Sequence, residues 1–444
     1  MLKINLKYII LTLMIAVPGM ARELSLDDAL KIALSENKNI QIALADLQYS
    51  DALIKEAWSY ALPHVTVSAD YSRNLMDNFF YITVSDSLGQ KSTTKFDVTF
   101  KNQFGLNAQL TQTIYSFGKV GTALDIAYDY ESFSDLQFRE QRNAILTQVK
   151  KAYYRALLSA KVADVAEESE QSALENYENV KIRFEGGLVS EFDLLQAEVR
   201  WQNAIPSTLE AQKNYQLATN NLKLLLNLPI EEPVEVKWDM DSYPAKPVKL
   251  PVEEVFGFKP GYQALLLEEQ MRRKNIKIEF ANHLPTLYGN ATYNYIANSD
   301  EFRLDNDNDN IVLGVGINFP IYSGGYTSAQ VQKARIDVDK IEKQVELSQD
   351  NIRIDLQNVY LRMDEAESRI EAAKKSVNSA RRAFEIAESR YANGLATQLE
   401  LKDSRIFLDQ AQITHLTAVY AYLEAYFDWE LLTGQVSFPN EEPN

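Results

Sequence analysis

The chain repeats itself over a distance of 207 residues, and this repeat limits the folds open to it. The segment Tyr115–Gly118 (YSFG) recurs as Tyr322–Gly325 (YSGG), and Arg183–Leu188 (RFEGGL) recurs as Arg390–Leu395 (RYANGL). Both pairs have the same offset, since 322 − 115 and 390 − 183 both give 207. A period this long is typical of neither a solenoid nor a propeller. Each copy is therefore predicted to be one large structural half.

Upstream of these landmarks the offset changes. Leu62-Pro63 matches Leu284-Pro285 at an offset of 222, so the first copy carries 222 − 207 = 15 additional residues before its Tyr-Ser. We expect them in a surface loop around Phe79–Tyr81. The predicted organisation is a signal peptide at 1–21, a first repeat at 22–226, a connector at 227–251, a second repeat at 252–434 and a C-terminal tail at 435–444. Five prolines make the connector non-helical, with room for one short strand.

The first residues have the pattern of a secretory signal. Lys3 and Lys7 precede an apolar run over 8–17, and Gly19 and Ala21 supply the small residues of a cleavage site. The alternative, a membrane anchor, is disfavoured because the run is shorter than the roughly 20 residues of a spanning helix. No later stretch approaches that length, which excludes a helical membrane protein. The exported chain is then either soluble or enters a membrane as a β-barrel.

The composition excludes several classes of function. The chain has no cysteine, which removes disulfides, thiolate metal sites and thiol catalysis. Its formal charge of −17 argues against nucleic acid as a partner. Only 16 Gly and 13 Pro occur in 444 residues, so long uninterrupted elements are expected.

Four segments alternate apolar and polar residues over about ten positions each, the length of a tilted strand that crosses a bilayer. They lie at 65–72, 106–114, 287–295 and 311–319, and their polar positions are mostly Thr, Ser, Asn, Gln and Gly. An ordinary half-buried sheet is the alternative reading of such alternation. Four strands are too few to close a barrel within one chain. An open edge in lipid is unfavourable, so a barrel would have to be built from several chains.

Two long helices are predicted between the strands and the Gly turns. Apolar residues follow a 4, 3, 4, 3 spacing from Ile352 to Tyr391, and the first copy keeps this spacing from Ile145 to Phe184. The distance from Gly118 to Gly186 is 68 residues, or roughly 100 Å of helix at 1.5 Å per residue. Returning helices follow each turn. The expected fold is mainly α, with long antiparallel helical hairpins and a pair of strand hairpins at 64–115 and 286–322.

The order of these parts resembles the TolC-like outer-membrane efflux proteins. The motifs that carry the resemblance are Ser25–Leu30 (SLDDAL), Ile321–Gly325 (IYSGG) and the turn Gly187–Leu195 (GLVSEFDLL). None is catalytic, and the resemblance covers nearly the whole mature chain.

The resemblance implies a homotrimer in the outer membrane of a Gram-negative bacterium, spanning into the periplasm. Four strands per chain would form a trimeric 12-stranded β-barrel in outer-membrane lipid, and the helical hairpins would form an α-barrel. It implies a passive channel, the exit duct of a tripartite efflux or type I secretion system, with a periplasmic adaptor and an inner-membrane transporter as partners. No enzymatic activity, cofactor, bound metal or nucleic acid is implied.

The resemblance also points to a gate at the periplasmic tip, around the turns 185–190 and 392–397. Its acidic ring falls on Glu400 and Asp403, and its closing contact on Tyr391 and Asp193. A further basic position of the family is Ala396 here. The turn residues themselves are Gly186, Gly187, Gly394 and Leu395.

Each gate residue also has a simpler interpretation. Glu400 and Asp403 fit a solvated helix face, Tyr391 fits the heptad seam, and Asp193 fits support of a helix start through the helix dipole.

Two other classes of protein compete with this interpretation. An enzyme is disfavoured because the three histidines, His64, His283 and His415, are scattered. The acidic run 305–309 lacks the Gly and the distal Glu of an EF-hand loop. A soluble periplasmic adaptor or coiled-coil scaffold is the other alternative, and membrane fractionation distinguishes it from a channel.

Overall fold

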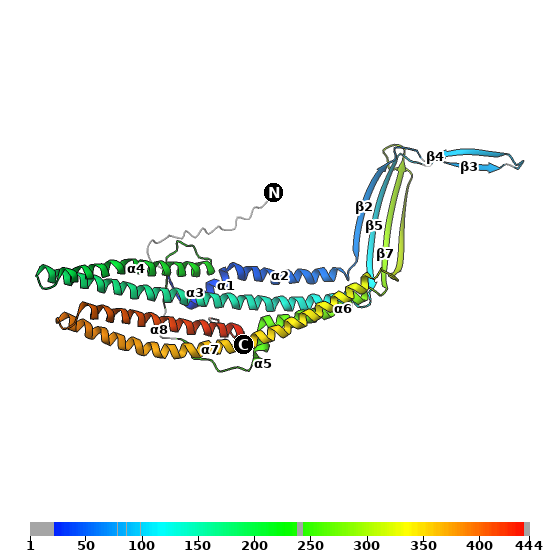
Figure 1. The fold of residues 1–444 in the computed structure, drawn as a ribbon. Helices are drawn as coiled ribbons and strands as arrows, with labels where there is room; N and C mark the ends of the chain where they lie inside the picture. Colours follow the sequence, from blue (N-terminus) through cyan, green and yellow to red (C-terminus); the bar gives the residue numbers. More distant parts are fainter. Residues whose placement is uncertain (1–21, 78, 86, 98, 238–242, 439–444) are drawn as a thin grey trace, which may run out of the picture. The chain divides into compact units, whose positions relative to one another are not determined.

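A computed structural model describes residues 22–77, 79–85, 87–97, 99–237 and 243–438 (Figure 1). The predicted signal peptide and the last six residues of the tail lie outside this range. The chain is mainly helical, as predicted, and forms two compact units. The first contains the described residues of Met1–Leu44, Phe138–Pro260 and Gln349–Asn444, and the second contains Ala45–Gln137 and Gly261–Ser348. Each unit draws on both halves of the sequence.

The sequence repeat is also a repeat of helices. Helices α3 (Lys119–Glu185) and α7 (Tyr326–Ala392) each have 67 residues and are offset by 207 at both ends. The returning helices α4 (Glu191–Leu225) and α8 (Gln398–Thr433) begin 398 − 191 = 207 residues apart. Upstream, α2 (Lys38–Ser59) and α6 (Pro260–Ala281) each have 22 residues and differ by 222. Both offsets of the sequence therefore recur at the ends of the helices.

Each opening helix is interrupted, which the periodicity does not predict. The first divides into α1 (Leu26–Glu36) and α2 because Asn37 turns its side chain onto the backbone: its Oδ1 accepts from the Asn39 amide at 2.9 Å, and its Nδ2 donates to the Leu225 carbonyl at 2.6 Å. The second divides into α5 (Val252–Phe258) and α6 at Lys259, the residue before a proline, where helical backbone is disfavoured.

The second unit contains an antiparallel sheet of four strands in the order β2-β5-β7-β8 (Figure 1). Each of the four alternating segments of the sequence falls in one of them, except that Phe319 lies one residue beyond the last strand. Their bounds are β2 (His64–Arg73), β5 (Asn102–Tyr115), β7 (Thr286–Ser299) and β8 (Asp307–Asn318).

The register of this sheet gives it one apolar and one polar face. One apolar row across the strands is Val67, Ala108, Tyr293 and Ile311, and the next is Val65, Leu110, Ala291 and Leu313. A polar row is Ser68, Asn107, Asn294 and Asn310. The three asparagines are joined in a ladder, with Nδ2 to Oδ1 distances of 2.6 and 3.1 Å. Among the described residues, the apolar rows are most open on the outer strands, where Leu313 is 78% exposed and Val67 is 67% exposed.

The predicted surface loop around Phe79 is instead a β-hairpin. Strands β3 (Phe79–Ser85) and β4 (Lys91–Asp97) pair with each other, and Phe80 stacks on Phe96 with ring centroids 5.9 Å apart. The other strands are β1 (Arg22–Leu24) and β6 (Val234–Val236), which pair in parallel. β6 is the short strand expected in the connector.

The core of the first unit lies along the heptad seam. The seam residues of α7 from Ile352 to Ala373 are buried, as are most of their counterparts in α3. Towards the hairpin end the packing becomes looser, because Phe384, Ala387 and Tyr391 are only partly buried. Among the described helices, none has an apolar stretch long enough to cross a membrane.

A buried ion pair joins α3 to α8 in this core. Lys150 Nζ lies 2.6 Å from Glu430 Oε2, and the two side chains are 3% and 2% exposed. The hydroxyl of Ser437 lies 3.0 Å from the same ammonium and donates to the other carboxylate oxygen at 2.7 Å.

Candidate functional site: the ends of the two helical hairpins

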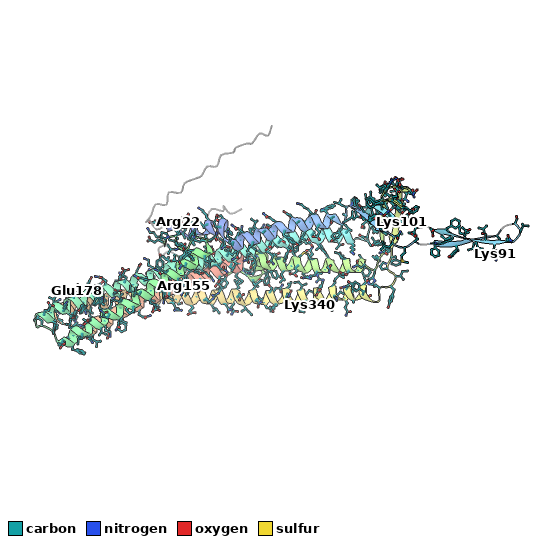
Figure 2. All side chains as sticks on the ribbon, turned by 90° about the horizontal axis from the view of Figure 1, so that it is seen from above. Arg22, Lys91, Lys101, Arg155, Glu178 and Lys340 are labelled. Carbon is teal, nitrogen blue, oxygen red and sulfur yellow. The ribbon has the colours of Figure 1, made fainter. Side chains whose placement is uncertain are left out.

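The turn between α3 and α4 closes with two backbone hydrogen bonds. The amide of Leu188 donates to the Arg183 carbonyl at 2.8 Å, and that of Gly187 donates to the Phe184 carbonyl at 2.9 Å. This is a Schellman motif, which needs a left-handed residue, and Gly187 has φ +70°. Glu178, labelled in Figure 2, lies two turns before this end of α3.

The turn between α7 and α8 has the same geometry. Leu395 donates to the Arg390 carbonyl at 2.8 Å, and Gly394 donates to the Tyr391 carbonyl at 3.0 Å, with φ +72° at Gly394. Gly186 lies in the first turn as predicted, but its φ is not in the left-handed region, and its counterpart at 186 + 207 is Asn393. Of Gly186 and Gly187, only Gly187 therefore needs to be glycine.

Asp193 and Glu400 occupy matching positions, since 400 − 193 = 207, and both form capping boxes. The Ser190 hydroxyl accepts from the Asp193 amide at 3.2 Å while Asp193 Oδ2 accepts from the Ser190 amide at 3.1 Å. Thr397 and Glu400 repeat this exchange with both distances at 3.2 Å. The pattern Ser/Thr-x-x-Asp/Glu before an apolar helix is the sequence signal for this arrangement. For Asp193 it supports the simpler interpretation, a role at the helix start.

Asp403 lies one turn further along α8 and is exposed. Its charge acts on Arg200 of α4: burial lowers the pKa of Arg200, while the carboxylates of Asp409 and Asp403 raise it. The two predicted ring positions therefore differ, because the Glu400 carboxylate caps the start of α8 and that of Asp403 does not.

Tyr391 is half-buried beside the guanidinium of Arg183, whose Cζ lies 5.6 Å from the ring centroid. Burial raises the pKa of Tyr391, the Arg183 charge opposes this rise, and the Asp193 charge adds to it. Tyr391 and Asp193 are thus close enough to interact electrostatically. Among the described hydrogen bonds, none joins the two side chains.

A groove of about 750 Å³ runs between α4 and α8 near the turns. Apolar residues of both helices line it, including Phe192, Val199 and Ile406, together with the cations Arg200 and Lys402. The groove could not be predicted from the sequence, because its walls come from two helices that are distant in the sequence.

A cluster of charged residues near this groove links three helices. Asp409 of α8 accepts from the Ser169 hydroxyl of α3 at 2.7 Å, and its other oxygen lies 2.7 Å from Arg405 Nε. Arg405 also lies 3.7 Å from Glu168 of α3 and 5.5 Å from the Phe384 ring of α7, which is the third helix. Burial raises the pKa of Asp409.

Large apolar side chains are exposed around the turns. Their exposed fractions are 78% for Leu188, 71% for Phe192, 69% for Leu395 and 67% for Phe407. Such a concentration is typical of a protein interaction site. In the part of the chain that the structure describes, no cluster of three or more His, Cys, Asp or Glu side chains could hold a metal ion.

The sequence family described as "Outer membrane efflux protein" matches residues 29–228 and 259–435, which is more than half of the chain. The outer membrane protein TolC of Vibrio cholerae serotype O1 is 22% identical over 220 residues, covering 48% of this chain and 50% of that protein. The alkaline protease secretion protein AprF of Pseudomonas aeruginosa is 24% identical over 231 residues and covers 48% of each chain. The chain thus spans about half the length of these two curated relatives.

The fold is similar to that of a solved outer-membrane channel. The crystal structure of CmeC of Campylobacter jejuni superimposes with a TM-score of 0.78 at 17% identity, covering 94% of this chain and 87% of that one. At this identity the match establishes the fold alone.

Proposed function

Because the chain belongs to the outer membrane efflux protein family, we propose that three copies of it form one passive channel, the exit duct of a tripartite efflux or type I secretion system. The protein is located in the outer membrane of a Gram-negative bacterium and extends into the periplasm. A family of efflux proteins supports a role in transport rather than in catalysis. It also disfavours the soluble adaptor that the sequence left open.

The observation that carries the trimeric channel is the four-stranded sheet. One face is apolar on every strand and exposed, which suits contact with lipid. The outer strands β2 and β8 have no further strand partner among the described residues. Unpaired edges are unfavourable in a bilayer, so β2 of one copy pairs with β8 of the next. Three copies supply twelve strands, enough for a barrel around an aqueous pore.

The helical hairpins form the periplasmic part of the duct and bind its partners. The groove between α4 and α8 and the exposed apolar side chains at the turns suit an adaptor protein that presents helices of its own. An inner-membrane transporter would complete the system.

The gate lies at the hairpin ends. Glu400 and Asp403 place two carboxylates per chain, and therefore six per trimer, around the entrance, which favours cations. The electrostatic interaction between Asp193 and Tyr391 contributes to the closed state.

Purified protein in planar bilayers tests this proposal. The double variant Glu400→Gln with Asp403→Asn removes the charge, while glutamine at 400 retains the capping geometry. We expect a reduced preference for cations with the channel still intact. Unchanged ion selectivity would refute the electrostatic role. Protein that is soluble in the periplasm and forms no channel would instead support the adaptor.

A further inference from the structure

The two hairpin ends have the same backbone but differ in one side chain. Arg183 and Arg390 are matched residues, 207 apart, and each lies four residues before the left-handed glycine of its turn. Arg390 stays within its own turn, where its Nη2 donates to the Leu395 carbonyl at 3.0 Å. Arg183 instead reaches the other hairpin, where its Nη2 donates to the Ala392 carbonyl at 3.3 Å. The pseudo-symmetry of the repeat is broken at this residue.

The acceptor explains why a cation is favoured there. Ala392 is the last residue of α7, and the final carbonyls of a helix have no partner within it and carry the negative end of the helix dipole. The guanidinium also lies over the Tyr391 ring, with Cζ 5.6 Å from the centroid. Arg183 thus makes two contacts to α7, one with the backbone and one with an aromatic face.

Among the described contacts, none joins Arg390 to the first hairpin in return. Tyr391 corresponds to Phe184, which is 38% exposed, and Ala392 corresponds to Glu185, the last residue of α3. Of the two matched arginines, only Arg183 contacts the other hairpin through these described bonds. Besides Arg183, the charge of Asp193 in the first hairpin also acts on Tyr391.

We propose that Arg183 is the positioning residue that holds the end of the first hairpin against the end of the second when the duct is closed. This inference rests on the proposed function. The contact is at the surface, where charged contacts are weak, so it is suited to being broken and re-formed. A partner that binds at the turns can displace it without disturbing the buried seam.

Matched arginine variants test the proposal. Arg183→Ala removes the contact between the hairpins, and Arg390→Ala removes the same side chain from the matched position as a control. In single-channel recordings we expect Arg183→Ala to increase the open fraction about two- to fivefold, the change typical of losing one exposed charged contact. Arg390→Ala should leave it as in the wild type. Equal behaviour of the two variants would overturn the proposal.

A conservative variant separates charge from geometry. Arg183→Lys keeps the positive charge but loses the planar guanidinium that both donates to the carbonyl and stacks on the ring. We expect an open fraction close to that of Arg183→Ala. A lysine variant with wild-type gating would refute the role of the guanidinium. Thermal unfolding of all three variants checks that they fold, since their transition temperatures should match that of the wild type.

A cross-link gives an independent readout. The chain has no cysteine, so Arg183→Cys with Ala392→Cys introduces a unique pair. A short bis-maleimide should join them and reduce the open fraction, whereas the single-cysteine variants should not respond to the reagent. A cross-linked duct that opens normally would overturn the proposal. If the wild-type protein forms no channel, the proposed function fails instead, and formation of the cross-link still reports whether the hairpin ends meet.

Discussion

At the scale of single residues, the turns show which glycines are required. Gly187 and Gly394 have positive φ values with no atom close to where a Cβ would lie, so the cost of replacing them is conformational rather than steric. We expect Gly187→Ala to destabilise the protein by about 1–2 kcal/mol, because an L-residue is strained in the left-handed region. Thermal unfolding followed by circular dichroism measures this cost. Gly186→Ala is the control and should be tolerated; an equal loss in both would contradict the assignment.

Ionisation of the Tyr153 hydroxyl at alkaline pH should lower the stability of the first unit. Its hydroxyl lies 2.8 Å from the carbonyl oxygens of Leu24 and Lys237, and burial raises its pKa from 10.0 to about 12. A raised pKa means that the fold favours the neutral phenol. The contribution of the neutral Tyr153 hydroxyl to the free energy of unfolding is present below pH 10 and is lost as the pH rises through about 12.

We therefore expect the transition temperature to fall between pH 10 and 12 in the wild type, over the interval set by this pKa. In Tyr153→Phe the fall should be smaller, from a lower starting value because the carbonyls of Leu24 and Lys237 lose the hydroxyl that donates to them. Parallel pH profiles for the two proteins would exclude Tyr153 as the source.

At the scale of elements, the core of the first unit includes an ion pair between α3 and α8 whose partners are distant in the sequence. Lys150 and Glu430 are almost completely buried, and removing one partner leaves an unpaired buried charge. We expect Glu430→Gln to destabilise the protein by about 3–5 kcal/mol. The double variant Lys150→Met with Glu430→Leu should recover most of this loss, because a packed apolar pair can replace buried charges. Thermal or denaturant unfolding measures both; failure of the double variant to recover would show that Ser437 also needs the charges.

The elements also show how far the sequence could be interpreted. Periodicity predicted the long helices, and alternation predicted the strands, because both depend on local spacing. Neither pattern predicted that the opening helix divides at Asn37, because the Asn37 side chain donates a hydrogen bond to the Leu225 carbonyl, 188 residues away. The β3–β4 hairpin was missed because an aromatic run between two strands reads equally well as a loop.

The candidate site was predicted in part. The turns followed from their glycines, and the chain carried enough information to identify the capping boxes through Ser190 and Thr397. The sequence could not predict that the Arg183 side chain contacts the other hairpin, because the sequence around Arg390 is so similar. Which of the two matched arginines does so depends on the hydrogen-bond acceptor in the other hairpin, and sequence spacing does not reveal that acceptor.

At the scale of the whole molecule, the proposed trimer depends on the two outer strands of the sheet, β2 and β8, which have no further strand partner among the described residues. In an edge strand, alternate backbone amides point away from the sheet, so one of two neighbouring positions must face outward. We expect that, of Val312→Pro and Leu313→Pro, the variant facing outward retains a folded chain but loses the trimer, because proline removes the amide needed by the next copy. The inward variant should instead disrupt pairing with β7.

Light scattering of detergent-extracted protein reports the number of copies, and circular dichroism reports helix content. Trimers from both proline variants would contradict pairing between the edges of neighbouring copies. A wild-type protein that is a stable monomer in mild detergent would do the same.

The equal length of α3 and α7 has a consequence for how such a chain can change over evolution. An insertion of seven residues in one helix alone would move its hairpin end by about 10 Å and leave the two ends at different depths. Arg183 would then face solvent instead of Ala392. Longer or shorter hairpins whose ends still meet therefore require matched insertions or deletions in both halves of the gene.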